Sequence, residues 1–185
     1  KVPTVRSIHH QKNMGLGAGV KEVIEIAKYS KFLIVSGDND VATEMLVELF
    51  KSRDKADVVL GYYVNKEERG RVRNLISSFF GLLYMCSFNI FVQYLNGPTI
   101  YPTPQLRQLD IKSTRFSITS ELATKLLCSG CTFHEVVGHM QTGLAGSSAI
   151  NLRNLLEVIM IFLRLIFEVK FQKKSEFSER PKRIF

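Results

Sequence analysis

Tryptophan is absent from this chain of 185 residues, which has only three cysteines and five prolines. An odd number of cysteines argues against a disulfide framework and favours reduced thiols. Cys128 and Cys131 are spaced like metal ligands, but no second pair and no suitably spaced histidine pair completes a zinc site. The sequence also shows no signal peptide, no internal repeat and no RNA- or DNA-binding signature, so we expect no nucleic-acid partner.

Acidic residues are fewer than basic ones, 17 against 25, which leaves a formal net charge of +8. A basic balance of this size favours an anionic partner, such as a nucleotide, a phosphate-bearing lipid or a membrane surface. The length fits one domain, and the 45% of hydrophobic residues can form a core.

Residues 31–40, KFLIVSGDND, combine an apolar run with a pair of carboxylates. Asp38 and Asp40 follow the run at an i, i+2 spacing, where two like charges would repel each other unless a cation lay between them. Carboxylates at the end of a buried strand are suited to hold a hard divalent cation and, through it, a diphosphate. The alternative is an ordinary polar turn, because Gly-Asp-Asn-Asp is also common turn chemistry.

A glycine turn precedes this stretch. Asn13, Gly15 and Gly17 lie just before an apolar pattern, from Val20 to Ala27, that recurs at steps of three and four and predicts a helix. Backbone N–H groups in such a turn suit close approach to a phosphate or a sugar. Most glycine turns, however, only reverse the chain.

In their order and spacing, several segments together resemble the family 2 glycosyltransferases with the GT-A fold, in particular polyprenyl-phosphate sugar transferases. The resemblance covers about residues 4–170. It is carried by NMGLGAG, FLIVSGDND, ADVVLGYYVNKEERGRVRNLISSFF (56–80), YLNGPTIYP (94–102), FSITSELATKLLCSGCTFHEVVGH (116–139) and GSSAINLR (146–153).

The resemblance implies a GT-A-like α/β fold and transfer of a sugar from a nucleotide-diphosphate sugar, expected to be UDP-linked, to a lipid-phosphate or saccharide acceptor. It further implies Mg²⁺ or Mn²⁺ as cofactor. The implied site residues are Asn13, Gly15, Gly17, Asp38 and Asp40 for the nucleotide sugar, Asp38, Asp40 and His139 for the metal, Arg71, Arg73, Asn96 and Gly97 for the acceptor, and Glu121 as general base.

The sequence also departs from the family pattern. The motifs that hold the base and ribose are absent, so we expect the N-terminal, nucleotide-binding part to be missing. Thr142 stands where an arginine is usual, and no aspartate precedes Gly97. These departures leave two alternatives open: a non-catalytic fragment that binds a membrane or serves as a scaffold, and a nucleotidyltransferase, which would need a basic glycine loop that this chain lacks.

Two apolar stretches point to a membrane surface. Residues 75–95 carry no charge but several polar side chains, which favours an interfacial or buried helix over a membrane span. Arg71 and Arg73 precede it, either as a solvated basic face or as phosphate contacts. We expect residues 1–150 to form a partial GT-A domain and 151–185 to form an amphipathic, membrane-associating helix with a basic tail. The tail would be disordered away from a membrane.

The periodicity predicts strands near 4–9, 31–36, 57–63, 97–101 and 132–138, and helices near 18–29, 41–52, 70–94, 117–129 and 150–169. Alternation of strands and helices predicts a mostly parallel sheet flanked by helices. We expect the protein at the cytoplasmic face of a membrane or in the cytoplasm, as a homo-oligomer or with a chain that completes the sheet.

Overall fold

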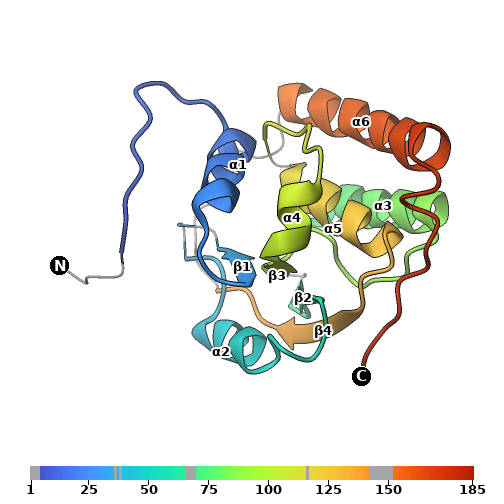
Figure 1. Cartoon of the computed structure of the whole chain (residues 1–185). Helices are drawn as coiled ribbons and strands as arrows, with labels where there is room; N and C mark the ends of the chain where they lie inside the picture. Colours follow the sequence, from blue (N-terminus) through green and yellow to red (C-terminus); the bar gives the residue numbers. More distant parts are fainter. Residues whose placement is uncertain (1–4, 36, 38, 66–69, 116, 142–151) are drawn as a thin grey trace.

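The computed structural model describes residues 5–35, 37, 39–65, 70–115, 117–141 and 152–185, without the side chains of residues 73 and 152–154 (Figure 1). Its elements are α1 (Leu16–Ile26), β1 (Lys31–Ile34), α2 (Thr43–Lys51), β2 (Val58–Tyr63), α3 (Arg71–Phe88), β3 (Thr99–Pro102), α4 (Thr103–Gln108), α5 (Ile118–Cys128), β4 (Phe133–Gly138), α6 (Leu152–Phe167) and a π-helical turn, Glu168–Gln172.

The strands in the described residues form one mixed sheet in the order β1-β3-β2-β4. β3 pairs antiparallel with both β1 and β2, whereas β2 and β4 pair in parallel over six residues. Strands β1, β2 and β4 therefore point in one direction and β3 in the other. The α/β prediction is confirmed, and three of these strands share a direction, but the only directly parallel pair described is β2–β4.

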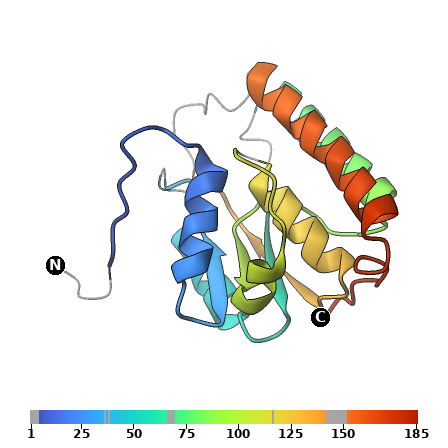
Figure 2. The same cartoon turned by 45° about the horizontal axis from the view of Figure 1, so that its top comes forward.

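Alternation along β2 sends its side chains to two separate cores. Val58 and Leu60 face the larger core, which is built with α1, α3, α4, α5 and α6. Val59 and Tyr63 face a smaller core that Met45 of α2 completes. Figures 1 and 2 show α2 on one side of the sheet and the other helices on the opposite side.

Two glycines let α2 approach the sheet. A β-carbon added at Gly61 would lie 2.5 Å from Cε of Met45, and one added at Gly138 would collide with the same side chain. Met45 is 1% exposed, so the thioether fills the space that these glycines leave open.

The predicted strands at 31–36, 57–63, 97–101 and 132–138 and all the predicted helices are present, with shifted ends. The helix predicted over 70–94 ends at Phe88, because Asn89 adopts a left-handed conformation with φ of 56°. The strand predicted near 4–9 is wrong for residues 5–9, which pair with no described strand; Val5 is 73% exposed.

The basic tail is ordered against the sheet, contrary to the prediction of disorder. The N–H of Phe133 donates to the carbonyl of Lys182 (2.9 Å), and the N–H of Ile184 donates to the carbonyl of Phe133 (2.7 Å). The Arg183 guanidinium pairs with Glu135 at 2.9 Å. Backbone hydrogen bonds, which composition does not report, hold this charged segment in place.

α6 has a buried side, which belongs to the main core, and an exposed side; its membrane association stays a prediction. Phe162 packs among the rings of Tyr84 and Phe88 of α3, with centroids 4.9 and 6.0 Å away. On the opposite side of α6, Met160 and Leu163 are exposed. In the described part of the chain, no helix has the length and apolarity needed to span a membrane.

Candidate functional site

The segments that follow β1, β2 and β4 meet at one edge of the sheet. They do so because these three strands point the same way, which brings their carboxyl ends together. Val41, after β1, forms an antiparallel bridge with Met140, after β4. Asn65, after β2, donates from Nδ2 to the carbonyl of Met140 (3.1 Å) and accepts the N–H of Met140 (2.8 Å). Asn65 is 9% exposed. This buried amide joins the segment after β2 to Met140, which in turn pairs with Val41 after β1.

Asp40 and His139 lie on opposite strands of that bridge. The N–H of Gln141 donates to the carbonyl of Asp40 (3.0 Å), and the N–H of Ala42 donates to the carbonyl of His139 (3.3 Å). The Asp40 side chain is half-buried and His139 is exposed. Asp40 is therefore opposite Gln141 and His139 is opposite Ala42, so two of the three predicted metal ligands lie diagonally across the bridge. Asp38 lies outside the described residues.

A carboxylate and an imidazole are donors that suit Mn²⁺ and, through the oxygen, Mg²⁺. Among the residues that the structure describes, no cluster of three or more His, Cys, Asp or Glu side chains is placed to hold a metal ion. The predicted third ligand, Asp38, is not among them. By residue type Asp40 and His139 suit the predicted cofactor, and their role as metal ligands stays a prediction.

The loop before β3 reaches the same edge, since Thr99 pairs with Ile34 of β1 and with Leu60 of β2. Asn96 in this loop is exposed and accepts a hydrogen bond from Oγ1 of Thr119 (3.0 Å). Its role as an acceptor contact stays a prediction.

Gly97, the other predicted acceptor residue of this loop, is buried. A β-carbon there would collide with the carbonyl of Gly61. Its closest neighbour is therefore the protein backbone.

The two predicted acceptor arginines lie in the first turn of α3. Arg71 is exposed to solvent. The side chain of Arg73 lies outside the described residues. Their roles as phosphate contacts stay a prediction.

The predicted glycine turn packs against the chain itself. Oδ1 of Asn13 accepts the N–H of Gly15 (2.9 Å), and Gly15 has φ of 84°, a conformation that favours glycine. The N–H of Gly17 donates to the carbonyl of Thr114 (2.9 Å), and a β-carbon there would collide with Ser113. This donor is occupied, so close backbone packing accounts for Gly17. Its role in phosphate binding stays a prediction.

The segment 112–115 beside this turn is held by two carboxylates. Glu121 accepts the N–H groups of Lys112 (2.9 Å) and Ser113 (2.7 Å), together with the Ser113 hydroxyl (2.5 Å). Glu157 of α6 accepts the N–H groups of Thr114 (3.3 Å) and Arg115 (3.0 Å). Four consecutive N–H groups thus bind carboxylates of two different helices.

Glu121, the predicted general base, is 1% exposed. Its Oε1 lies 2.9 Å from Nζ of Lys125, which also pairs with Glu168 at 2.9 Å and donates to the carbonyl of Asp110 (2.6 Å). Burial raises the pKa of Glu121, but the Lys125 charge and the Ser113 hydrogen bond outweigh it, so the pKa lies below its usual range. This setting favours a structural role over proton transfer.

Sequence reasoning missed Asn65, Lys125 and Glu157. A polar residue directly after the buried run VVLGYYV was a usable signal for Asn65. Lys125 stands four residues after Glu121 in an apolar helix, the spacing of a helical ion pair. Nothing local marks Glu157, because its partners lie more than forty residues away.

No protein-family model and no curated protein matches this chain. Among solved structures, it is similar to glucosyl-3-phosphoglycerate synthase from Mycobacterium tuberculosis in complex with Mn²⁺, uridine-diphosphate-glucose and phosphoglyceric acid. The TM-score is 0.52 at 14% identity, over 89% of this chain and 57% of that chain. The same synthase with Mn²⁺, uridine-diphosphate-glucose and glycerol 3-phosphate gives 0.46 at 13% identity, over 96% and 58%.

At this identity the likeness establishes the fold, which is of the GT-A type predicted from the sequence. The chain spans 57% of the length of the synthase in the first of these structures.

Proposed function

We propose that this chain transfers a sugar from a UDP-linked nucleotide sugar to an acceptor that carries a phosphate group. The observation that supports it most is the bridge Val41–Met140, across which Asp40 and His139 lie diagonally at the ends of β1 and β4. In open α/β sheets, ligands bind in this position. The similar synthase, crystallised with Mn²⁺, uridine-diphosphate-glucose and phosphoglyceric acid, supports the same class of ligands.

Asp40 and His139, with Asp38, would hold the Mg²⁺ or Mn²⁺ ion. When bound, such an ion neutralises charge on the departing diphosphate. Asn65 fixes the backbone of Met140 and so orients the neighbouring His139. Asn13, Gly15 and the exposed Asn96 complete the proposed surface for the sugar nucleotide and the acceptor.

A phosphate acceptor is already ionised and requires no base, which agrees with the buried setting of Glu121. We assign Glu121 the positioning of segment 112–115, next to the glycine turn. The proposed acceptor is a lipid phosphate or a small phosphate ester, with Arg71 and Arg73 as its proposed contacts. A saccharide hydroxyl, the other acceptor that the sequence resemblance implies, would require a base. The polyprenyl-phosphate subclass rests on the sequence resemblance.

Binding of UDP with and without Mn²⁺, measured by calorimetry, tests the proposal. We expect Mn²⁺-dependent binding that Asp40→Ala weakens by at least about tenfold. Asp54→Ala is the matched control, because Asp54 is a 74% exposed carboxylate in another part of the molecule. Metal-independent binding of equal strength in wild type and Asp40→Ala would refute the metal site.

A non-catalytic, membrane-binding or scaffold role is the second candidate. It is favoured by the exposed apolar residues Leu75 (72%) and Phe79 (58%) of α3 and Met160 (62%) and Leu163 (59%) of α6. Such residues suit a peripheral protein at a membrane face, or a contact with another copy or chain. Measurement of the molar mass in solution, together with flotation on vesicles, separates these outcomes from a monomer that binds neither.

A further inference from the structure

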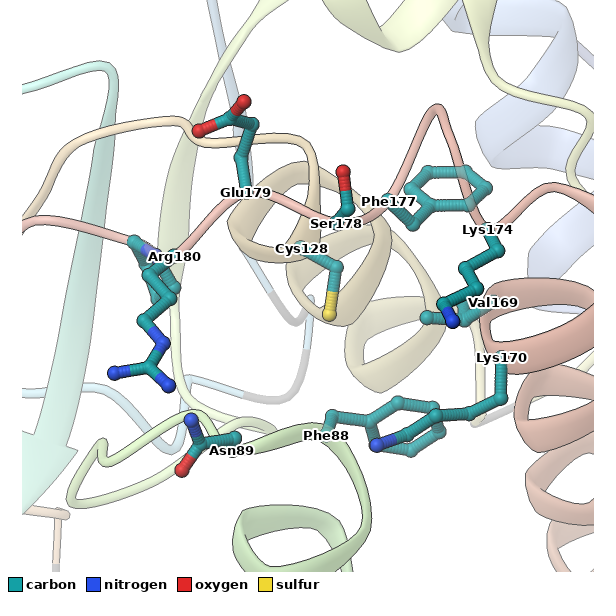
Figure 3. A pocket seen from close by; sticks show the side chains of 11 residues that line it. Phe88, Asn89, Cys128, Val169, Lys170, Lys174, Phe177, Ser178, Glu179 and Arg180 are labelled. Carbon is teal, nitrogen blue, oxygen red and sulfur yellow. The ribbon is translucent and has the colours of Figure 1, made fainter.

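A pocket of about 220 Å³ lies between the ends of α3 and α5 and the segment that follows α6 (Figure 3). Cys128, the last residue of α5, and Pro181 of the tail both line it. Pro181 precedes Lys182, whose carbonyl accepts the N–H of Phe133 at the start of β4. The pocket is thus near the start of β4, whereas the candidate site lies where β4 ends.

Three cationic side chains and one carboxylate, that of Glu179, line this pocket. Lys170 and Lys174 belong to the segment after α6, and Arg180 belongs to the tail. Within the described residues, no carboxylate forms an ion pair with any of these three cations. Figure 3 shows the Glu179 carboxylate turned away from the Arg180 guanidinium. The pocket therefore has excess positive charge without an internal partner.

The floor of the pocket is apolar. Phe88 and Val169 are 6% and 4% exposed, and Cys128 is 3% exposed. Burial raises the pKa of the Cys128 thiol to about 12, so the floor stays uncharged at neutral pH. Asn89 adds an amide at the rim, below Arg180 in Figure 3. The lining thus combines cations and an amide donor with a neutral base.

We propose that this pocket binds the phosphate group of an amphipathic phosphate ester. A guanidinium matches a phosphate by two parallel hydrogen bonds, and ammonium groups add charge. Phe167 and Phe171, on either side of Lys170 in the sequence, are 55% and 70% exposed, with ring centroids 5.9 Å apart. These rings would cover the apolar part of the ligand. The proposal is independent of sugar transfer, because it uses none of the residues at the other edge.

The test uses the triple variant Lys170→Ala, Lys174→Ala, Arg180→Ala. All three side chains are exposed, so we expect the variant to fold, as circular dichroism would verify. The matched control removes the same charge elsewhere through Lys12→Ala, Lys28→Ala and Arg53→Ala, which are also exposed. Two probes are used: inorganic phosphate in calorimetry, and phosphatidylcholine vesicles with or without phosphatidic acid in flotation.

We expect the triple pocket variant to bind the same probe as wild type but more weakly, by about fivefold to tenfold for each of the three removed cations. The control triple variant should keep most of the affinity. Binding of vesicles only when they contain phosphatidic acid identifies a lipid headgroup, and binding of inorganic phosphate alone identifies a soluble ester; both support the pocket. Equal losses in the two triple variants, or no binding of either probe by wild type, overturn it. Mn²⁺-dependent UDP binding, measured in parallel, reports the other site separately.

Discussion

Two places that hold predicted functional residues, the core around Glu121 and the edge of the sheet around Asp40, differ in burial. In the core, Glu121 and Glu168 both pair with Lys125, and Glu121 also accepts backbone N–H groups. At the edge, Asp40 is half-buried and its neighbour His139 is exposed. The carboxylates of the core are thus bound by partners within the chain, whereas the side chains of Asp40 and His139 are partly or fully exposed to solvent.

The difference indicates that residue type alone does not distinguish a predicted metal ligand from a structural carboxylate. Asp40 follows an apolar strand and Glu121 lies in an apolar helix. In sequence, both resemble functional residues of the family 2 glycosyltransferases. Burial and local donors separate them, because a carboxylate with several donors and a buried cation has no reason to exchange protons. The following predictions would break or sharpen this contrast.

Lys125→Met should have the largest effect on stability. The change leaves Glu121 and Glu168 in the core without their shared cation, and breaking a buried pair in this way costs about 3–5 kcal/mol. Urea denaturation would measure it. Lys51→Met is the control: Lys51 pairs with Glu48 at the surface, where such pairs contribute about 0–1 kcal/mol. Equal losses in both variants would contradict a structural core cluster.

Acid should destabilise the protein partly through Glu121. Because its folded pKa lies below the unfolded value of about 4.3, ionised Glu121 stabilises the fold above that pH. The contribution disappears as the pH falls through the folded pKa. Glu121→Gln should therefore be less stable at neutral pH and show a shallower acid decline in urea midpoints. Glu48→Gln, at an exposed position, should keep the wild-type slope.

Asn65→Ala should loosen the edge of the sheet without disturbing the core cluster. It removes both hydrogen bonds to Met140 and leaves buried backbone groups unsatisfied, at a cost of about 1–3 kcal/mol. Mn²⁺-dependent UDP binding should weaken as well, because His139 is next to Met140 in the same backbone segment. Asn96→Ala, which removes one exposed side-chain contact, should lower stability less. Unchanged UDP affinity in Asn65→Ala would argue against the edge as the binding site.

His139→Ala should have the smallest effect on stability, within about 0.5 kcal/mol, because the side chain is exposed. The same change should weaken Mn²⁺-dependent UDP binding. His9→Ala, at another exposed histidine, serves as the control for both measurements. If His139→Ala lost much stability but kept its UDP affinity, His139 would have a structural role, contrary to the contrast between edge and core.

Much of the fold could be predicted because apolar runs and helical periodicity are local signals. The runs at 31–36 and 57–63 became β1 and β2 with small shifts at their ends. The direction of a strand in the sheet has no such local signal. The loop before Thr99 starts β3 at the edge where β2 ends, so β3 runs antiparallel to β2, and the periodicity of the sequence does not predict this. α4 was missed because it has only six residues.

The candidate site was predictable only where chemistry and local pattern agree. Asp40 is a candidate because of its place after a strand, and its role stays a prediction, whereas the setting of Glu121 depends on backbone donors that the sequence does not display. Gly17 looked like a ligand-binding glycine, because a close approach to phosphate and a close approach to Ser113 need the same absence of a β-carbon.

The short pairing of the tail with Phe133 also has a consequence for handling the protein. β4 is the last strand in the described order, and an uncovered outer strand is a template for pairing between copies. Residues 182–184 occupy part of that template. Removal of residues 182–184 would therefore uncover this part of β4 and promote self-association.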